Sequence, residues 1–372
     1  MEFAPTQSQV ELSALAASIL EDRATPERVA EVERDGEGFD ADLWAHLATA
    51  GVIGAALPES AGGDGFGLAE QCSVLTAIGR AVAPVPYLET VVLGAGAIAR
   101  FGSAAQIARW AVPAVTGRLI ITAALAEPGA GDPRAPSARA ERAGAAWRLS
   151  GTKTAVSAGV PAGLFLIPAT TDRGAAVFCV ERADPGVTAE PQQLVDGPGA
   201  VSLVLADVEL RGDRLLGTAD GAAAGWLADR AIIGICAHQL GVTERALELT
   251  AEHARNRQQF GRAIGAFQAV AQRLADAYID VEAIRLTMWQ AAWRLEAGLQ
   301  CEEEIATAKF WAAEGGHRVA HTAVHIHGGV GIDTSHPLHR YFTAAKRNEF
   351  NLGGATAQLR RLGAAIAGGL RE

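Results

Sequence analysis

The chain has 372 residues, of which 49% are hydrophobic and 20% charged, and its formal net charge is -10. This length predicts two or three domains with a sizeable core, because domains average roughly 150 residues. The ordinary globular composition excludes wholesale disorder, and the excess of acidic residues disfavours binding to nucleic acid or to an anionic membrane surface.

The first zone of the chain, residues 1–118, is predicted to be helical. Leu12, Leu15 and Ile19 fall at i, i+3 and i+7, which is the spacing of one buried helix face. The apolar segment 88–101 is too short to cross a membrane, so we expect a helix of the core there.

The middle zone, residues 119–217, is predicted to be a small β domain. Short apolar runs of strand type are separated there by Gly, Pro and Asp. These runs lie at 119–125, 164–167, 176–180 and 201–208.

The last zone, residues 218–372, is again helical. Apolar residues over 270–288 follow a 3.6-residue period, and a second long helix is predicted over 303–324. The run GGDGFG at 62–67 follows a helix and a proline instead of a strand, so it does not predict a Rossmann unit. The order of helices, sheet and helices indicates an α+β protein.

The cysteines predict a reducing compartment. Cys72, Cys179, Cys236 and Cys301 lie far apart and form no CxxC pair, which excludes a cysteine-rich zinc site and a dense disulfide framework. The start of the chain, MEFAPTQSQVELSA, lacks the basic residues of a secretory signal, and no uncharged apolar run reaches the roughly 18 residues of a membrane span. We therefore expect a cytoplasmic protein.

Four stretches, in the family order, resemble the acyl-CoA dehydrogenase family and cover nearly the whole chain. They lie at 43–71 (LWAHLATAGVIGAALPESAGGDGFGLAEQ), at 126–132 with 150–159 (AEPGAGD and SGTKTAVSAG), at 255–276 (RNRQQFGRAIGAFQAVAQRLAD) and at 325–346 (HIHGGVGIDTSHPLHRYFTAAK). The resemblance implies the α+β fold of that family and FAD-dependent oxidation of acyl-CoA thioesters. It also implies an N-terminal helical domain over 1–118, a β-barrel-like domain over 119–217 and a four-helix bundle over 218–372.

The resemblance implies six FAD contacts: Arg257, Phe260, Gln268, His325, Gly328 and Gly329. A diphosphate needs charged donors and close main-chain amides, which an arginine and paired glycines supply. Alternatively, Arg257 is a solvated surface charge and the glycine pair is a helix C-cap. His325 stands where the family commonly has Gln. Histidines at 321, 325 and 327 suggest a metal, but no carboxylate ligand is evident and no metal site is predicted.

No catalytic residue is predicted in this chain. Removing the α-proton of an acyl thioester needs a carboxylate in a dry pocket. The family places a Glu at one of two positions, and this chain has Leu352 at the first and Ala231 at the second. Asp229 and Glu349 lie nearby, but a surface role is favoured for both.

The expected site of the flavin ring is also depleted. Where the family usually has Thr, Ser and Trp, this chain has Ala126, Asp132 and Ala155, so hydroxyl donors and a stacking surface are lost. Asp132 adds a negative charge near the expected diphosphate. Ser157 keeps a hydroxyl where the family has Thr.

These differences lead to the hypothesis of a subunit that shares flavins with a homologous partner. In the family, the stretch with Arg257, Gln268 and the HGG motif reaches the flavin of a neighbouring subunit. We expect an α2β2 heterotetramer whose partner supplies the Glu base, with electron-transfer flavoprotein or a similar protein as electron acceptor. The chain resembles the heteromeric acyl-CoA dehydrogenases of actinobacterial steroid breakdown, which act on sterol side-chain CoA thioesters. The alternatives are a self-sufficient homotetramer using Asp229 or Glu349 and a non-enzymatic CoA-thioester-binding scaffold.

Overall fold

The computed structural model describes residues 6–129 and 132–369, and the chain forms two compact units. Of the described residues, the bundle unit comprises those up to Pro26 together with 72–83 and 233–369, and the sheet unit comprises 27–71, 84–129 and 132–232. Helices α5 (Leu68–Ala81) and α9 (Ala222–Asn256) contribute to both units. The three domains predicted from the sequence form a different division and stay a prediction.

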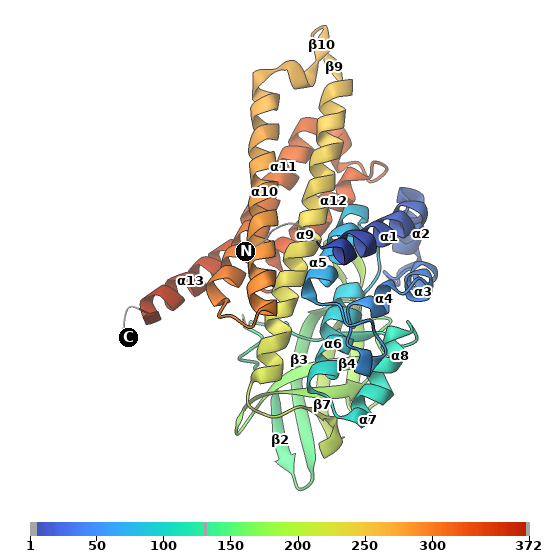
Figure 1. Cartoon of the computed structure of the whole chain (residues 1–372), viewed down its shortest axis with the longest axis vertical. Helices are drawn as coiled ribbons and strands as arrows, with labels where there is room; N and C mark the ends of the chain where they lie inside the picture. Colours follow the sequence, from blue (N-terminus) through green and yellow to red (C-terminus); the bar gives the residue numbers. More distant parts are fainter. Residues whose placement is uncertain (1–5, 130–131, 370–372) are drawn as a thin grey trace. The chain divides into compact units, whose positions relative to one another are not determined.

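The bundle unit is built from long helices. Apart from its parts of α5 and α9, its helices are α1 (Gln7–Arg23), α10 (Gln268–Glu296), α11 (Glu302–His327), α12 (Leu338–Phe350) and α13 (Ala355–Gly369). Between α9 and α10 lie a hairpin and a 3-10 turn, and a second 3-10 turn follows α11: β9 (Gln258–Gln259), β10 (Arg262–Ala263), η5 (Ile264–Ala266) and η6 (Gly328–Ile332). Figure 1 shows the hairpin beyond the ends of α9 and α10. Both long helices predicted from the apolar period are confirmed.

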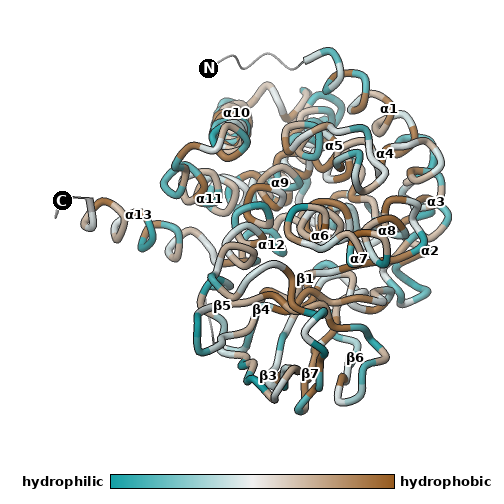
Figure 2. Tube along the Cα trace, turned by 60° about the horizontal axis from the view of Figure 1, so that its bottom comes forward, coloured by the Kyte–Doolittle hydropathy of each residue, from teal (hydrophilic) through white to brown (hydrophobic). Residues whose placement is uncertain are grey.

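The sheet unit holds an eight-stranded sheet with the order β6-β7-β3-β2-β4-β5-β8, and β1 pairs in parallel with β4. Its strands are β1 (Ile121–Ala123), β2 (Arg139–Ala143), β3 (Ala146–Val156), β4 (Leu164–Thr171), β5 (Gly174–Glu181), β6 (Val187–Leu194), β7 (Gly197–Arg211) and β8 (Leu215–Leu216). Strands β4 and β5 are buried along most of their length, and Figure 2 shows the hydrophobic colouring along β1 and β4. The predicted middle β region and the α+β class are confirmed.

Short helices complete the sheet unit: α2 (Pro26–Asp35), α3 (Ala41–Thr49), α4 (Val52–Ala55), η1 (Glu59–Ala61), η2 (Leu88–Ala95), α6 (Gly96–Phe101), α7 (Ala104–Gln106), η3 (Ile107–Ala111) and α8 (Val112–Val115). The segment 88–101 is buried as predicted, but its first part, η2, is π-helical. Thr90 Oγ1 donates to the carbonyl of Ile121 at 3.1 Å, which ties η2 to β1. A Cβ on Gly94 would approach Ile121 to 2.6 Å, so this close packing requires glycine.

The bundle unit packs α5 and α9 unusually closely. A Cβ on Gly241 would lie 2.0 Å from the Thr76 carbonyl oxygen, and one on Gly79 would lie 2.1 Å from that of His238. Thr76 Oγ1 also donates to the Ala237 carbonyl at 3.2 Å. The glycines therefore let the two backbones approach where any side chain would separate them.

The first helix buries a different face from the predicted one. In α1 the buried residues are Leu12, Ala16 and Leu20, four residues apart, while Leu15 is 42% exposed. The prediction that Leu15 faces the core is therefore wrong. The buried side of α1 includes Ala16, whose small side chain allows the helix to pack closely there. Within residues 6–129 and 132–369, no helix combines the length and apolar character needed to cross a membrane.

Candidate nucleotide-binding site

Three of the predicted FAD contacts lie on the connection between α9 and α10. Arg257 directly follows α9, and the main-chain N–H of Ile264 donates to its carbonyl at 2.8 Å, which closes the loop around the hairpin. Phe260 is 92% exposed at the tip of the hairpin, with a left-handed φ of 52°. Gln268 is exposed and begins α10. The connection thus presents a guanidinium, an aromatic ring and a carboxamide to its surroundings.

The other three lie at the end of α11. Gly328 has φ 66° and is the C-cap of this helix, as the alternative interpretation predicted. A Cβ on Gly328 or Gly329 would meet nothing within 4 Å, so the main chain here borders open space. His325 is exposed, and it lies about 200° around the helix from His327. It therefore faces away from the side on which His327 packs.

A histidine contact brings these two regions together. The rings of His253, in the last turns of α9, and His327 are stacked with centroids 4.3 Å apart. The glycines that follow His327 therefore lie beside the end of α9 that leads to Arg257. We call Arg257, Phe260, Gln268 and the Gly328–Gly329 pair the clasp region.

The clasp region suits the nucleotide end of FAD. Within the described part of the chain, the Arg257 guanidinium has no hydrogen bond or ion pair, so its donors are available to a phosphate. The exposed Phe260 ring offers an apolar surface, and the open main chain at Gly328–Gly329 admits a bulky anionic group. This donor set fits a dinucleotide diphosphate.

Two histidines beside the clasp region, His253 and His336, were not predicted from the sequence to belong to the site. His253 lies four residues before Arg257, and this spacing places neighbouring side chains on one side of a helix. The sequence could therefore have predicted that His253 lies near the site. His336 lies with its centroid 5.4 Å from that of His327. Among the described residues, no group of three or more His, Cys, Asp or Glu side chains is arranged to hold a metal ion.

The two positions where the family carries its base hold apolar side chains in this structure. Leu352 is half-buried with φ 56°, and Ala231 is buried in α9. The nearby Glu349 carboxylate is held by an ion pair, since its Oε2 lies 2.5 Å from Lys346 Nζ, and by a polar contact at 3.1 Å with His317 Nδ1. These partners hold Glu349 against its own unit.

Asp229 is likewise engaged. Its carboxylate accepts a hydrogen bond from the Arg134 guanidinium, whose Nη1 also lies 3.3 Å from Asp132 Oδ1. The negative charge that Asp132 was expected to add near the diphosphate is partly offset, because Asp132 shares the Arg134 guanidinium with Asp229. Asp229 would have to leave this ion pair before it could take a proton from a substrate.

Glu127 is fixed as an anion inside the sheet unit. It lies 2.5 Å from Lys153 Nζ and accepts hydrogen bonds from Ser137 and from the main-chain N–H of Ala138. Burial acts to raise the pKa of Glu127, but these hydrogen bonds outweigh it and lower that pKa to about 2. A carboxylate of such low basicity cannot abstract an α-proton, so this geometry gives Glu127 a structural role.

The positions expected around the flavin ring lie near one another on the sheet. The Ala126 carbonyl accepts from the Thr154 N–H at 3.0 Å, and the Ala155 N–H donates to Gln192 Oε1 at 2.8 Å. Ala155 has φ 50° and sits at an irregularity in the β3–β7 register. Neither alanine brings a hydroxyl or an aromatic ring to this part of the sheet unit.

Comparisons with known proteins identify the family to which the chain belongs. The family description "Acyl-CoA dehydrogenase, N-terminal domain" matches residues 6–118, and "Acyl-CoA dehydrogenase, C-terminal domain" matches residues 224–367. Acyl-CoA dehydrogenase FadE27 of Mycobacterium tuberculosis is 50% identical, with 99% of each chain covered.

Solved structures share the whole fold. A chain of the ChsE4-ChsE5 complex from Mycobacterium tuberculosis matches with a TM-score of 0.94 at 49% identity, over 99% of both chains. A chain of a Tcur3481-Tcur3483 steroid ACAD variant matches with a TM-score of 0.93 at 42% identity, over 98% of this chain and 99% of that chain. FAD is the cofactor of these flavoproteins, as predicted. The chain therefore belongs to the acyl-CoA dehydrogenase family, a family of oxidoreductases that act on acyl-CoA.

Proposed function

We propose that this chain is the flavin-sharing subunit of a heterotetrameric acyl-CoA dehydrogenase, in which a homologous partner supplies the catalytic Glu. The observation that carries the proposal is a contrast within the chain. Within the described residues, the Arg257 guanidinium of the clasp region makes no hydrogen bond or ion pair and can bind a phosphate, while both base positions, Leu352 and Ala231, are apolar. Such a chain is suited to binding the nucleotide end of FAD and unsuited to removing the α-proton of an acyl thioester.

The division of labour in the proposed enzyme follows from these residues. Arg257 would hold the diphosphate through charge-assisted hydrogen bonds, Phe260 would offer its apolar ring to the nucleotide, and Gln268 and the glycine pair would add polar contacts. His325, the sixth predicted contact, lies on another side of α11, where it would reach the cofactor only from outside the clasp region. FAD, when bound, supplies the hydride acceptor for the β-carbon of the acyl chain. The partner's Glu takes the α-proton, and the electrons pass to electron-transfer flavoprotein or a similar acceptor.

Exposed apolar residues on two helices of the bundle unit support the proposal of a partner chain. Ile279, Leu286 and Trp293 recur every seven residues along α10 and are 62%, 51% and 40% exposed. Leu359 and Ile366 repeat the same spacing on α13 and are exposed as well. Apolar stripes of this kind are costly in water and are typical of helix faces that another helix covers. We assign that cover to the homologous partner because a similar solved structure is described as the ChsE4-ChsE5 complex.

We further propose a steroid side-chain CoA thioester as the substrate and the cytoplasm as the compartment. The first proposal is supported by the similar Tcur3481-Tcur3483 protein, which is described as a steroid ACAD. The second is supported by the four cysteines, which are all buried and form no disulfide.

The flavin content of purified protein tests the proposal. Expressed alone, the chain is expected to be colourless or insoluble because it lacks the flavin-ring contacts. Expressed with its partner, it should give a yellow complex with one FAD per two chains, measured by absorbance against protein concentration. One tightly bound FAD per chain in the isolated protein, with turnover of acyl-CoA, would contradict it.

Two carboxylate variants test whether the chain supplies its own base. In the complex, Asp229→Asn and Glu349→Gln are each expected to leave kcat/KM within about twofold of the natural value, because both carboxylates are engaged in ion pairs. Steady-state dehydrogenation assays with a dye acceptor measure this. A loss of about 100-fold or more in either variant would identify that residue as the base and support the homotetramer alternative.

A further inference from the structure

Three histidines from different segments form a stack beside the clasp region. The rings of His253 and His327 are 26° from parallel with centroids 4.3 Å apart, and His336 lies 5.4 Å from His327. His253 lies one turn before Arg257 on α9, His327 directly precedes Gly328, and His336 belongs to the loop before α12. The stack therefore joins the helix that ends before Arg257 to the loop that starts at Gly328.

Main-chain contacts identify the proton positions on two of these rings. His327 Nδ1 lies 2.9 Å from the Ala323 carbonyl oxygen, so this nitrogen carries a proton and donates it. His336 Nδ1 accepts from the Leu338 N–H at 3.2 Å, so this nitrogen carries none. A second proton on His336 would have to go to Nδ1, where it would face the Leu338 N–H and break the hydrogen bond. The observed geometry is therefore that of neutral His336.

We propose that the stack of His253, His327 and His336 is a pH-sensitive positioning device for the FAD clasp. While the rings are neutral, they hold the Gly328 loop against the end of α9. When protons are taken up, the positively charged rings repel one another, the loop separates from α9, and the nucleotide is released. This inference rests on the proposed flavin-sharing function and adds a control of the same site.

The direction of the pH effect follows from proton linkage. Burial, then the charges of Arg257 and His336, lower the pKa of His253. Burial and the charges of His253 and His336 lower the pKa of His327, against the hydrogen bond to Ala323. When the stack opens, His253 and His327 regain the ordinary histidine pKa of about 6.5, so the open arrangement binds protons more tightly than the closed one. The closed stack is fully favoured above about pH 6.5 and loses stability as the pH falls below that value.

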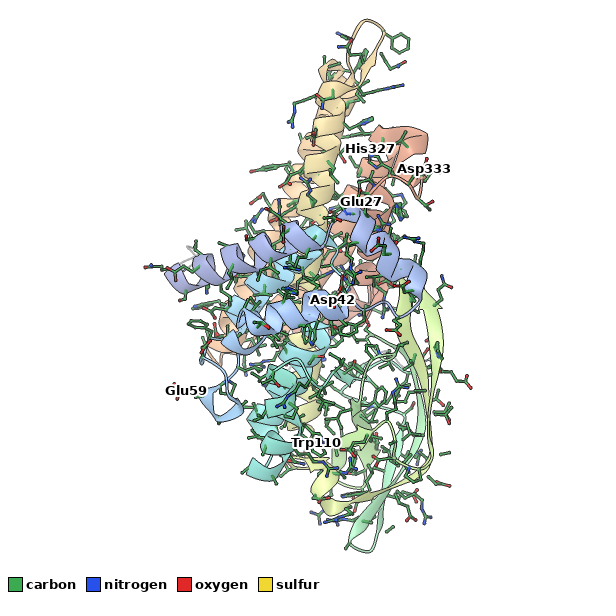
Figure 3. The ribbon with its side chains drawn as sticks, turned by 90° about the vertical axis from the view of Figure 1, so that its right-hand side faces the viewer. Glu27, Asp42, Glu59, Trp110, His327 and Asp333 are labelled. Carbon is green, nitrogen blue, oxygen red and sulfur yellow. The ribbon has the colours of Figure 1, made fainter. Side chains whose placement is uncertain are left out.

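Two further titratable groups lie close to His336, one in its loop and one at the start of α12. Asp333 and His339 lie on either side of His336, and the Asp333 carboxylate interacts with both histidines. Hydrogen bonds from Ser335, supplemented by these histidines, lower the pKa of Asp333. Figure 3 labels His327 and Asp333, which flank the turn η6. Asp333 therefore stays anionic over the range in which the stack titrates.

The test compares FAD release from the co-expressed complex at about pH 7.5 and about pH 5.5. The natural chain is expected to release FAD at least about fivefold faster at the lower pH, and His253→Phe less than about twofold faster, because phenylalanine keeps a ring in the stack but cannot be protonated. The control is His46→Gln, which removes an exposed histidine from α3 in the sheet unit. It should behave like the natural chain.

Hydrogen exchange over residues 326–337, corrected for the intrinsic pH dependence, gives a readout that does not need FAD. Protection of these main-chain amides from exchange should fall at the lower pH in the natural complex and persist in the His253→Phe complex. If His253→Phe fails to fold, His336→Asn replaces it, since asparagine keeps an acceptor for the Leu338 N–H. An unaltered pH response of release and exchange in the folded variant would overturn this inference alone. Failure of the proposed function would instead appear as FAD retention that does not depend on Arg257 at pH 7.5.

Discussion

Replacing Lys153 with methionine is expected to destabilise the protein by about 3–5 kcal/mol, because the buried Glu127 carboxylate then loses its cation. The Lys153 side chain is 0% exposed, and its Nζ also donates to the Pro168 carbonyl at 2.7 Å. The remaining donors from Ser137 and Ala138 cannot neutralise the charge of Glu127. Urea denaturation of the complex at fixed protein concentration measures the change in the free energy of unfolding.

An exposed ion pair on the same strand provides the matched control. Arg148 and Glu209 lie 3.4 Å apart across β3 and β7, with side chains that are 50% and 71% exposed. Arg148→Met is expected to cost at most about 1 kcal/mol, because water already solvates both charges. Equal costs for Lys153→Met and Arg148→Met would show that burial of the Lys153–Glu127 pair does not stabilise the sheet unit.

Local patterns in the sequence were enough to predict the main helices and strands. The apolar period over 270–288 and the strand runs of the middle zone depend on neighbours within one element, so they can be read without the fold. Arg257 and the Gly328–Gly329 pair could be proposed as cofactor contacts because the motifs of the family resemblance are contiguous, and that role stays a prediction. Glu349 also had a readable partner, since Lys346 lies three residues before it on the same helix.

What the sequence did not predict depends on contacts between distant segments. Arg134 and Asp229 are 95 residues apart in the sequence, so the residues around either one do not predict their ion pair. His253 and His327 meet only because α9 and α11 pack together. The π-helical geometry of η2 has no hydropathy signature, because a buried apolar run looks the same in either helix type.

Replacing Arg257 with alanine is expected to weaken FAD binding in the complex by about 1.5–3 kcal/mol, or about 10- to 150-fold in Kd. The guanidinium is exposed and makes no hydrogen bond or ion pair among the residues that the structure describes. Its removal should therefore leave the stability of the apo-chain nearly unchanged while removing the charge-assisted bonds to the diphosphate. Fluorescence titration of the apo-complex with FAD measures the affinity, and urea denaturation measures the stability.

Arg255 offers a matched control for this loss of affinity. It is an exposed arginine on α9 two residues before Arg257, about 200° away around a helix, so it faces a different side. Arg255→Ala should keep the natural affinity for FAD, and Arg257→Lys should recover part of it because lysine restores the charge without the planar fork of donors. If Arg255→Ala and Arg257→Ala lose affinity equally, general surface charge explains the binding. If neither loses affinity, the clasp region does not hold the cofactor, and the partner chain binds FAD unaided.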